Sequence, residues 1–185
     1  MKFEKLEIPE VIMITPKVFE DDRGYFFEAY RENKFKENSL DLKFVQENQS
    51  SSAKGTLRGL HYQKEPFQQG KLVRALVGEI FDVAVDIRKD SPTYKKWVGR
   101  ILSDQNKAML YIPEGFLHGF YVLSENAVVN YKCTSYYKPE AEASVIWNDE
   151  SINIKWPLLA NVPLIISQKD QNASRLTQNG LRQSG

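Results

Sequence analysis

Short runs in which apolar and polar residues alternate recur along most of the chain, separated by turn-forming residues. The clearest run is residues 79–87. By the two-residue period of a strand, one of its faces carries Phe81, Val83, Val85 and Ile87, and the other carries Ile80, Asp82, Ala84 and Asp86. This alternation predicts a half-buried strand. Comparable runs lie at residues 11–14, 25–30, 44–49, 56–63, 72–77, 97–102, 108–112, 120–123 and 127–135. Strands this short and this regularly spaced predict an all-β sandwich, jelly roll or barrel.

One helical segment interrupts the strands. Residues 31–38 are charged or polar apart from Phe35, and we expect this helix to cover a sheet edge. Turns are predicted at residues 104–107 and at residues 113–115, where Pro113 and Gly115 favour one. Since no linker, internal repeat or low-complexity tract is found, residues 1–185 predict a single domain with its core at about 11–170. The polar tail, from about 172 to 185, is expected to be loose.

Composition removes several classes of function. The 185 residues are 42% hydrophobic, enough for one core, and 25 basic and 24 acidic side chains leave a net charge of +1. No general attraction to nucleic acid or to anionic membranes is therefore expected. The beginning of the chain mixes charged with apolar residues, and no run approaches the ~18 apolar residues of a membrane span. A single cysteine, Cys133, suits a reducing compartment, so we expect a cytoplasmic protein.

Candidate chemistry gathers in residues 55–71, which contain Arg58, His61 and Lys71. In a regular strand the side chains of Arg58 and His61 would point to opposite faces. Gly59 lies between them, and a glycine inside a strand often marks a bulge that re-aims its neighbours. A bulge would bring both side chains into one pocket. The alternative is that His61 is a hydrogen-bonded core histidine and that Arg58 is a solvated surface charge.

Other chemistries find less support. His61 and His118 are the only histidines, they form no His-x-His pair, and Cys133 is the only thiol, so no metal site is expected. Neither a nucleophile elbow nor a phosphate-binding glycine loop occurs. Proton chemistry remains, with His61 as a base and tyrosines as acids. Tyr131 and Tyr137 would share a strand face if residues 128–137 formed one strand, although aromatic residues in β cores mostly pack.

Six motifs carry a resemblance to a known family. They are the segments 44–50 (FVQENQS), 55–63 (GTLRGLHYQ), 69–73 (QGKLV), 78–88 (GEIFDVAVDIR), 112–120 (IPEGFLHGF) and 130–134 (NYKCT). In this order they resemble the dTDP-4-dehydrorhamnose 3,5-epimerases. The resemblance extends from about residue 12 to about residue 170.

The resemblance implies a cupin-type jelly roll with a few short helices, acting as a homodimer without metal or organic cofactor. It implies an isomerase that inverts C3 and C5 of dTDP-4-dehydro-6-deoxy-D-glucose, giving dTDP-4-dehydro-L-rhamnose in dTDP-L-rhamnose biosynthesis. Both protons lie α to the C4 ketone, so removal of either produces an enolate with its charge on O4. Such a site needs a base, an acid on the opposite face and a cation near O4.

Residue roles follow from the same resemblance. The base resembles His61, oriented by Asp170, the acid resembles Tyr131, and Lys71, helped by His118, would stabilise the enolate oxygen. Arg23 and Arg58 resemble contacts to the diphosphate, which suits the paired donors of a guanidinium. Tyr137 resembles the aromatic ring that stacks on thymine. Further binding positions are Glu28, Gln46, Asn48, Glu142 and Lys169.

The chain departs from the family pattern at three places. Glu47 stands between Gln46 and Asn48 where the family usually has aspartate, and residues 147–150 (WNDE) and 167–170 (SQKD) each differ from the common motif. These changes affect loop geometry and nucleotide affinity but remove no catalytic group. Four alternatives stay open: an epimerase acting at C3 only, one acting on a GDP- or CDP-linked sugar, a non-catalytic cupin that binds a nucleotide sugar, and a structural protein.

Overall fold

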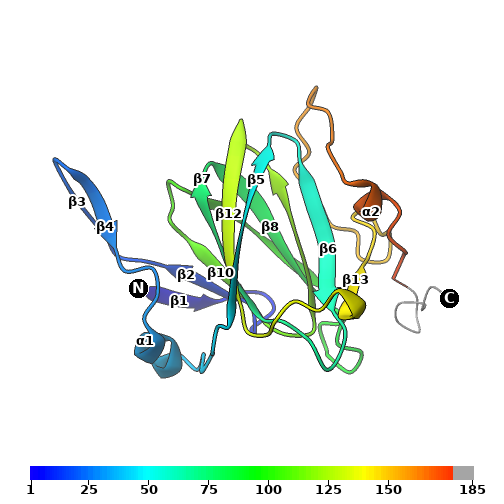
Figure 1. Cartoon of the computed structure of the whole chain (residues 1–185), viewed down its shortest axis with the longest axis horizontal. Helices are drawn as coiled ribbons and strands as arrows, with labels where there is room; N and C mark the ends of the chain where they lie inside the picture. Colours follow the sequence, from blue (N-terminus) through cyan, green and yellow to red (C-terminus); the bar gives the residue numbers. More distant parts are fainter. Residues whose placement is uncertain (177–185) are drawn as a thin grey trace.

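Two antiparallel sheets face each other and form the expected jelly roll (Figure 1). The computed structural model describes residues 1–176. In spatial order, one sheet contains β1 (Lys2–Lys5), β2 (Ile12–Thr15), β10 (Met109–Ile112), β7 (Lys71–Val77), β12 (Asn126–Cys133) and β5 (Gln46–Ala53). The other contains β13 (Glu142–Ser144), β6 (Leu57–Gln63), β11 (Phe116–Val122), β8 (Glu79–Asp86) and β9 (Trp97–Ser103). Each predicted strand segment is confirmed, and three strands are additional: β1, β13 and β3 (Val18–Asp21).

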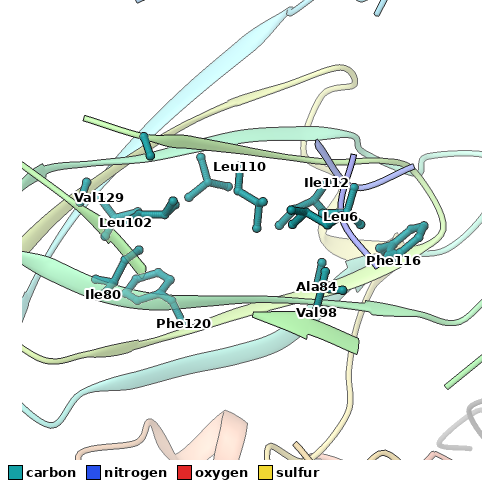
Figure 2. Close-up of a cluster of buried hydrophobic side chains, with 14 of the residues drawn as sticks. Leu6, Ile80, Ala84, Val98, Leu102, Leu110, Ile112, Phe116, Phe120 and Val129 are labelled. Carbon is teal, nitrogen blue, oxygen red and sulfur yellow. The ribbon is translucent and has the colours of Figure 1, made fainter. Parts of the chain in front are cut away.

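The main hydrophobic core lies between the two sheets. Figure 2 shows side chains from both sheets pointing toward one another across this space. Labelled members include Leu110, Ile112 and Val129 from one sheet and Ile80, Ala84, Val98, Phe116 and Phe120 from the other. Because apolar side chains fill part of the interior, any pocket between the sheets has to occupy the remainder.

Strand β8 is buried on both of its faces, so the prediction of a half-buried strand is wrong. Ile80 and Ala84 face the core between the sheets, whereas Val83 and Val85 pack in a second cluster on the outer face of the sheet. That cluster includes Ile152 and is flanked by Trp156 from the segment that follows β13. The alternation was read correctly, but only the folded chain shows that a long C-terminal segment covers the outer face.

The predicted helix forms as α1 (Glu32–Glu37), but it covers a sheet face and not an edge. Its single apolar residue, Phe35, is fully buried against Ile14, Leu72 and Met109, which belong to three neighbouring strands. An aromatic ring needs an apolar surface on which to pack, and a sheet face offers a larger one than an edge. The other helical pieces are η1 (Pro139–Ala141) and α2 (Gln168–Gln171).

A two-stranded hairpin stands apart from both sheets. Its strands, β3 (Val18–Asp21) and β4 (Gly24–Phe27), pair only with each other in the described part of the chain, and Figure 1 shows them extending away from the barrel. Three aromatic side chains on it are more than half exposed, and Phe26 is 72% exposed. Two-stranded ribbons are marginal in water, and exposed aromatic patches mark interaction surfaces.

The first residues of the polar tail are ordered, so the expectation of a loose tail is wrong for residues 172–176. The amide of Ile146 donates to Ser174 O at 3.0 Å, and the amide of Leu176 donates to Asp149 Oδ2 at 2.7 Å. Leu176 itself is buried. The rest of the tail, residues 177–185, lies outside the described residues. Within residues 1–176 no helix has the length and apolar character needed to cross a membrane.

Acid sensitivity follows from Asp86, a fully buried carboxylate at the end of β8. Burial alone would raise its pKa, but hydrogen bonds from Arg88, Ser91 and Thr93 lower it to about 2, from an ordinary 3.8. A lowered folded-state pKa stabilises the protein at any pH above the unfolded pKa, and this contribution is lost as the pH falls toward 2. The contribution amounts to about 2 kcal/mol.

We expect Asp86→Asn to lower the unfolding free energy at pH 7 by this amount and to flatten the decline of the unfolding free energy between about pH 4 and 2. Urea unfolding of both proteins at pH 7 and pH 2.5 measures the difference, and an identical acid response of the two would contradict it.

Candidate active site

A bulge in β6 places Arg58 and His61 on the same face of the sheet. On the neighbouring strand β11, His118 pairs with His61 and Phe120 pairs with Arg58, so β6 uses three steps where β11 uses two. Since cross-strand partners share a face, and His118 and Phe120 are two residues apart, Arg58 and His61 point the same way. Gly59 lies at the bulge with a φ of +127°, and a Cβ there would lie 2.6 Å from Gly119 Cα. The predicted bulge is confirmed, and only glycine fits it.

His61 forms a close pair with a buried carboxylate. Its Nε2 lies 2.6 Å from Oδ1 of Asp170, which is only 3% exposed. The other oxygen accepts from the amide of Gly59 at 3.3 Å. Burial would raise the pKa of Asp170, but the hydrogen bond and charge of His61 together with the Gly59 amide keep it below its ordinary value. The carboxylate is therefore ionised at neutral pH and fixes the imidazole ring.

Asp170 reaches this position because the chain turns into a short helix next to β6. Ser167 is the N-cap of α2, and its Oγ accepts from the amide of Asp170 at 3.1 Å. Serine is a favoured N-cap because its side chain satisfies a backbone amide that has no partner inside the helix. Asp170 thus lies in the first turn of a capped helix, where its backbone is fixed.

An open cleft of about 450 Å³ begins at the His61–Asp170 pair. Its lining includes Arg58 and Lys169, so two cationic side chains stand near the histidine. Arg58 Nε donates to Ser52 Oγ at 2.9 Å, which ties β6 to the edge strand β5 of the other sheet. The cleft is open enough and basic enough to receive an anionic ligand.

Tyr131 and Lys71 project into the interior from the sheet opposite His61. Tyr131 lies on β12, and its ring centroid is 6.3 Å from that of His118. Burial raises its pKa, so the phenol is protonated at neutral pH. Lys71 on β7 is buried, and burial lowers its pKa, while Cys133, Asp82 and Glu142 oppose that effect. The interior between the sheets thus holds a histidine on one side and a phenol and an amine on the other.

A chain of hydrogen bonds connects the remaining polar residues to this group. Lys169 pairs with Glu142 at 2.5 Å, and Glu142 accepts from the hydroxyl of Tyr137 at 2.8 Å. The Tyr137 amide donates to Gln46 Oε1 at 2.8 Å, and the Gln46 side chain donates to Asn48 Oδ1 at 3.0 Å. Asn48 Nδ2 donates to Cys133 Sγ at 3.8 Å, and Asn48 lies directly opposite Tyr131 in the β5–β12 ladder. These residues come from five separate segments, and only the fold brings them together.

The condition under which Tyr131 and Tyr137 would share one strand face is not met. Strand β12 ends at Cys133, and Tyr137 lies in the irregular segment that follows it. Tyr137 nevertheless stands at the rim of the site, 47% exposed, because Gln46 and Glu142 hold its amide and its hydroxyl. An exposed ring held at both ends is suited to stacking against a flat ligand.

A larger cavity of about 790 Å³ lies elsewhere, lined by residues that include Tyr62, Arg88 and Tyr94 but neither histidine. Its charged side chains are of both signs, so its lining does not indicate one class of ligand. Among residues 1–176, no group of three or more histidine, cysteine or acidic side chains is placed to hold a metal ion.

Comparison with known proteins identifies the family. The family model described as dTDP-4-dehydrorhamnose 3,5-epimerase matches residues 5–178. The chain belongs to this family. The dTDP-4-dehydrorhamnose 3,5-epimerase of Methanothermobacter thermautotrophicus is 52% identical over 178 residues, which cover 96% of each chain.

Solved structures of family members agree in fold. The epimerase from Legionella pneumophila, in complex with dTDP-4-keto-L-rhamnose, superimposes with a TM-score of 0.89 at 48% identity and covers 94% of this chain and 92% of that one. A 3'-monoepimerase from Streptomyces bikiniensis, in complex with dTDP-quinovose, has a TM-score of 0.85 at 30% identity and covers 92% and 85%. This chain is therefore more similar to the double epimerase than to the single one.

Two residues expected from the family resemblance do not lie in this group. Arg23 is at the tip of the β3–β4 hairpin, with its side chain 89% exposed and paired with Asp21. Glu28 follows the hairpin and pairs with Arg31 and Lys34. Neither Arg23 nor Glu28 lines the cleft that contains His61. Within a single chain, the hairpin and the segment that follows it therefore hold both residues outside the cleft.

One further buried residue, Asp82, is not among the candidates predicted from the sequence. Asp82 is fully buried, and its Oδ1 lies 2.7 Å from Nε2 of His118. The signal was present in the alternation of β8, where an acidic residue occupies a core-facing position between Ile80 and Ala84. A charged residue at such a position needs a partner, and that partner could not be named from the sequence.

Proposed function

We propose that this protein is a dTDP-4-dehydrorhamnose 3,5-epimerase that converts dTDP-4-dehydro-6-deoxy-D-glucose to dTDP-4-dehydro-L-rhamnose. The observation that carries this proposal is the placement of His61, paired with Asp170, on one sheet and of Tyr131 on the opposite sheet. A sugar ring held between the sheets meets a base on one face and an acid on the other. Inversion at a carbon requires this arrangement, because the proton must leave from one side and return from the other.

The roles proposed for the residues follow from the chemistry. His61 removes the proton from C3 and from C5, and the ionised Asp170 stabilises the imidazolium that forms. Tyr131 returns a proton to the opposite face. Lys71 lies buried in the interior, where a positive charge acts strongly on the enolate oxygen at O4. No step needs a cofactor, because the ketone of the substrate itself acidifies both carbons.

The cleft beside His61 fits the nucleotide part of the substrate. Arg58 and Lys169 provide positive charge for the diphosphate. Tyr137, held by Gln46 and Glu142, provides an exposed ring for the thymine base. The hydrogen-bonded chain from Lys169 ends at Asn48, which is the cross-strand neighbour of Tyr131, so the residues that bind the nucleotide lie next to the acid.

Isotope exchange tests the function directly. Incubated with dTDP-4-dehydro-6-deoxy-D-glucose in deuterated water, the protein should place deuterium at both C3 and C5, which mass spectrometry and proton NMR resolve. A non-catalytic binder predicts saturable binding without label, and a structural protein predicts no binding of dTDP. Label at C3 alone would indicate a single epimerase, and label at neither carbon would refute the proposal. Parallel assays with GDP- and CDP-linked analogues test the choice of base.

We also propose that the protein acts as a homodimer in which the β3–β4 hairpin completes the partner's site. The hairpin carries exposed Phe19, Tyr25 and Phe26 and makes few contacts with its own barrel, which leaves an aromatic surface available to a second copy. In a symmetric dimer the same hairpin of each subunit can reach the other subunit's cleft. Arg23 and Glu28 would then serve a site in the partner.

Mixed dimers test this exchange. We expect Arg23→Ala to raise KM about ten- to a hundredfold, because a charge-assisted hydrogen bond to the diphosphate is lost. Coexpressing the Arg23→Ala and His61→Ala chains should give dimers in which one site has both native residues. At low substrate concentration roughly a quarter of wild-type activity should return, since half of randomly assorted dimers are mixed and each has one intact site. Activity equal to the mean of the two single variants would show that Arg23 acts within its own chain.

A cytoplasmic location is proposed on the basis of the single thiol. Cys133 is buried and reduced, as is common where disulfides do not form. Cell fractionation of the native host, followed by immunoblotting, is expected to place the protein in the cytoplasmic fraction, and recovery in a periplasmic or secreted fraction would contradict this.

A further inference from the structure

The centre of the five-stranded sheet contains a second histidine–carboxylate pair, formed by His118 and Asp82. Of these two residues, only His118 has a role in the reaction described above. Nε2 of His118 on β11 lies 2.7 Å from Oδ1 of Asp82 on β8. His118 is 6% exposed and Asp82 is not exposed at all. Both face the interior between the sheets, and His118 lies directly opposite His61 across the β6–β11 ladder. Asp82 thus lies behind a residue of the site, one strand further from His61.

Asp82 is costly to bury as it stands. Its second oxygen, Oδ2, is buried and has no hydrogen-bond partner among the described residues. An uncompensated buried carboxylate oxygen destabilises a protein, so an uncharged residue would serve packing better at this position. The charge of Asp82 does act on Lys71, the buried amine on β7, since it opposes the lowering of the Lys71 pKa by burial. The negative charge of Asp82 therefore destabilises the packing of the core but favours the protonated form of Lys71.

The hydrogen bond to Asp82 also determines which ring nitrogen of His118 carries a proton. An ionised carboxylate can only accept, so Nε2 donates, and in the neutral ring Nδ1 has no proton. Four charged or titratable groups face His118 from separate strands: Asp82 on β8, Lys71 on β7, His61 on β6 and Tyr131 on β12. Burial, with help from Lys71 and His61, lowers the pKa of His118 against the opposing effect of Asp82, so the ring is neutral at pH 7.

We propose that Asp82 is a positioning residue for the epimerisation: it holds His118 in the Nε2–H tautomer and provides the negative charge that balances the Lys71 ammonium. This inference rests on the proposed function and deepens it. The family resemblance predicted His118 as a donor to O4, but a neutral ring whose proton points at Asp82 has no second proton to donate. Lys71 is then the donor to the enolate oxygen, and His118 accepts a hydrogen bond through Nδ1.

The tautomer can be measured in the wild-type protein without any assay of activity. Because the chain has only two histidines, ¹⁵N-histidine labelling gives four ring-nitrogen signals, and His61→Ala identifies the pair that belongs to His118. Long-range ¹H–¹⁵N NMR at pH 7 should show His118 with a protonated Nε2 and an unprotonated Nδ1. A protonated Nδ1, or an even mixture of the two tautomers, would overturn the proposal.

The variant Asp82→Asn tests the role of the charge with little change of shape. We expect kcat to fall about tenfold to a hundredfold with KM nearly unchanged, as is typical when the partner that orients a functional histidine is removed. The His118 ring-nitrogen signals should move toward a mixture of tautomers. The alkaline limb of the kcat–pH profile should shift to lower pH, because Lys71 loses the negative charge that keeps it protonated.

Asp86→Asn is the matched control, since Asp86 is fully buried on the same strand and the same face of β8 but is bonded to Arg88, Ser91 and Thr93. It should reduce stability and leave both the His118 signals and the alkaline limb unchanged. A loss of activity in Asp82→Asn with the wild-type alkaline limb and unchanged His118 signals would show a merely structural role and refute the proposal. If Asp82→Asn does not fold, the NMR measurement of the His118 tautomer in the wild-type protein still tests the proposal. If the wild-type protein exchanges no deuterium, the proposed function fails, while the NMR result still tests the pairing of Asp82 with His118.

Discussion

Replacing His61 by alanine is expected to abolish deuterium exchange at both C3 and C5. Among residues 1–176, His61 is the only histidine that lines the cleft, where it lies 2.6 Å from the buried Asp170, and the methyl group of alanine cannot accept a proton. General-base catalysis contributes about a hundredfold to ten-thousandfold, so turnover should fall by at least about a thousandfold when both steps depend on one base. Mass spectrometry of the sugar after incubation in deuterated water measures both positions together.

Tyr62→Phe is a suitable control for this variant. Tyr62 is the next residue on β6, and it lines the larger cavity instead of the cleft. Its substitution should leave exchange at both carbons unchanged. Asp170→Asn should give an intermediate loss, because the base remains but the charge that stabilises its protonated form is gone. Near-normal turnover by His61→Ala would show that another group is the base.

Replacing Tyr131 by phenylalanine is expected to separate exchange from inversion. His61 can still remove a proton and return it, or a solvent deuteron, to the same face, so label should continue to enter the substrate. Inversion requires a proton on the opposite face, and it should fall about a hundredfold to ten-thousandfold without the phenol. Comparing the rate of label incorporation with the rate of product formation by NMR measures the two processes in one sample.

Tyr111→Phe controls for the loss of a buried tyrosine hydroxyl. Tyr111 is also buried, and burial raises its pKa to about 12, but it packs on the outer face of the sheet with Phe35 and Leu72. This variant should retain both exchange and inversion. Equal losses of exchange and inversion in Tyr131→Phe would instead make Tyr131 necessary for forming the enolate, and its assignment as the acid on the opposite face would be wrong.

The fold could be predicted from local patterns because strand and turn conformations depend mainly on neighbouring residues. Alternation located the strand segments, and Gly59 indicated a bulge that the structure confirms through its positive φ and the shifted register of β6. Faces of elements were harder to predict, since burial depends on what packs there. The alternation predicts a half-buried β8, but the segment after β13 covers its outer face. Helix α1 covers a face and not an edge because Phe35 packs on an apolar surface.

In the candidate site, too, the residues could be named from the sequence, but their arrangement could not be predicted. Motifs named His61, Asp170 and Tyr131 as a group through family resemblance, but periodicity alone could not bring them together, since they lie on β6, α2 and β12. Asp82 was visible as an acidic residue in an apolar alternation, yet its partner His118 lies 36 residues away. Long-range pairs of this kind have no signal in a single sequence, because nothing local constrains which two strands become neighbours.

By itself, the sequence determined most of the segments that become strands, several turns, the absence of a general attraction for nucleic acid and, through its motifs, the family. The tertiary structure decided the rest. It placed His61 and Tyr131, the proposed base and acid, on opposite sheets. It put a carboxylate next to each histidine and held Arg23 on a hairpin outside its own cleft. The physical reason is the separation in sequence between interacting groups. Backbone conformation depends on adjacent residues, whereas the position of a proton depends on burial and on charges that only the folded barrel brings within a few ångströms.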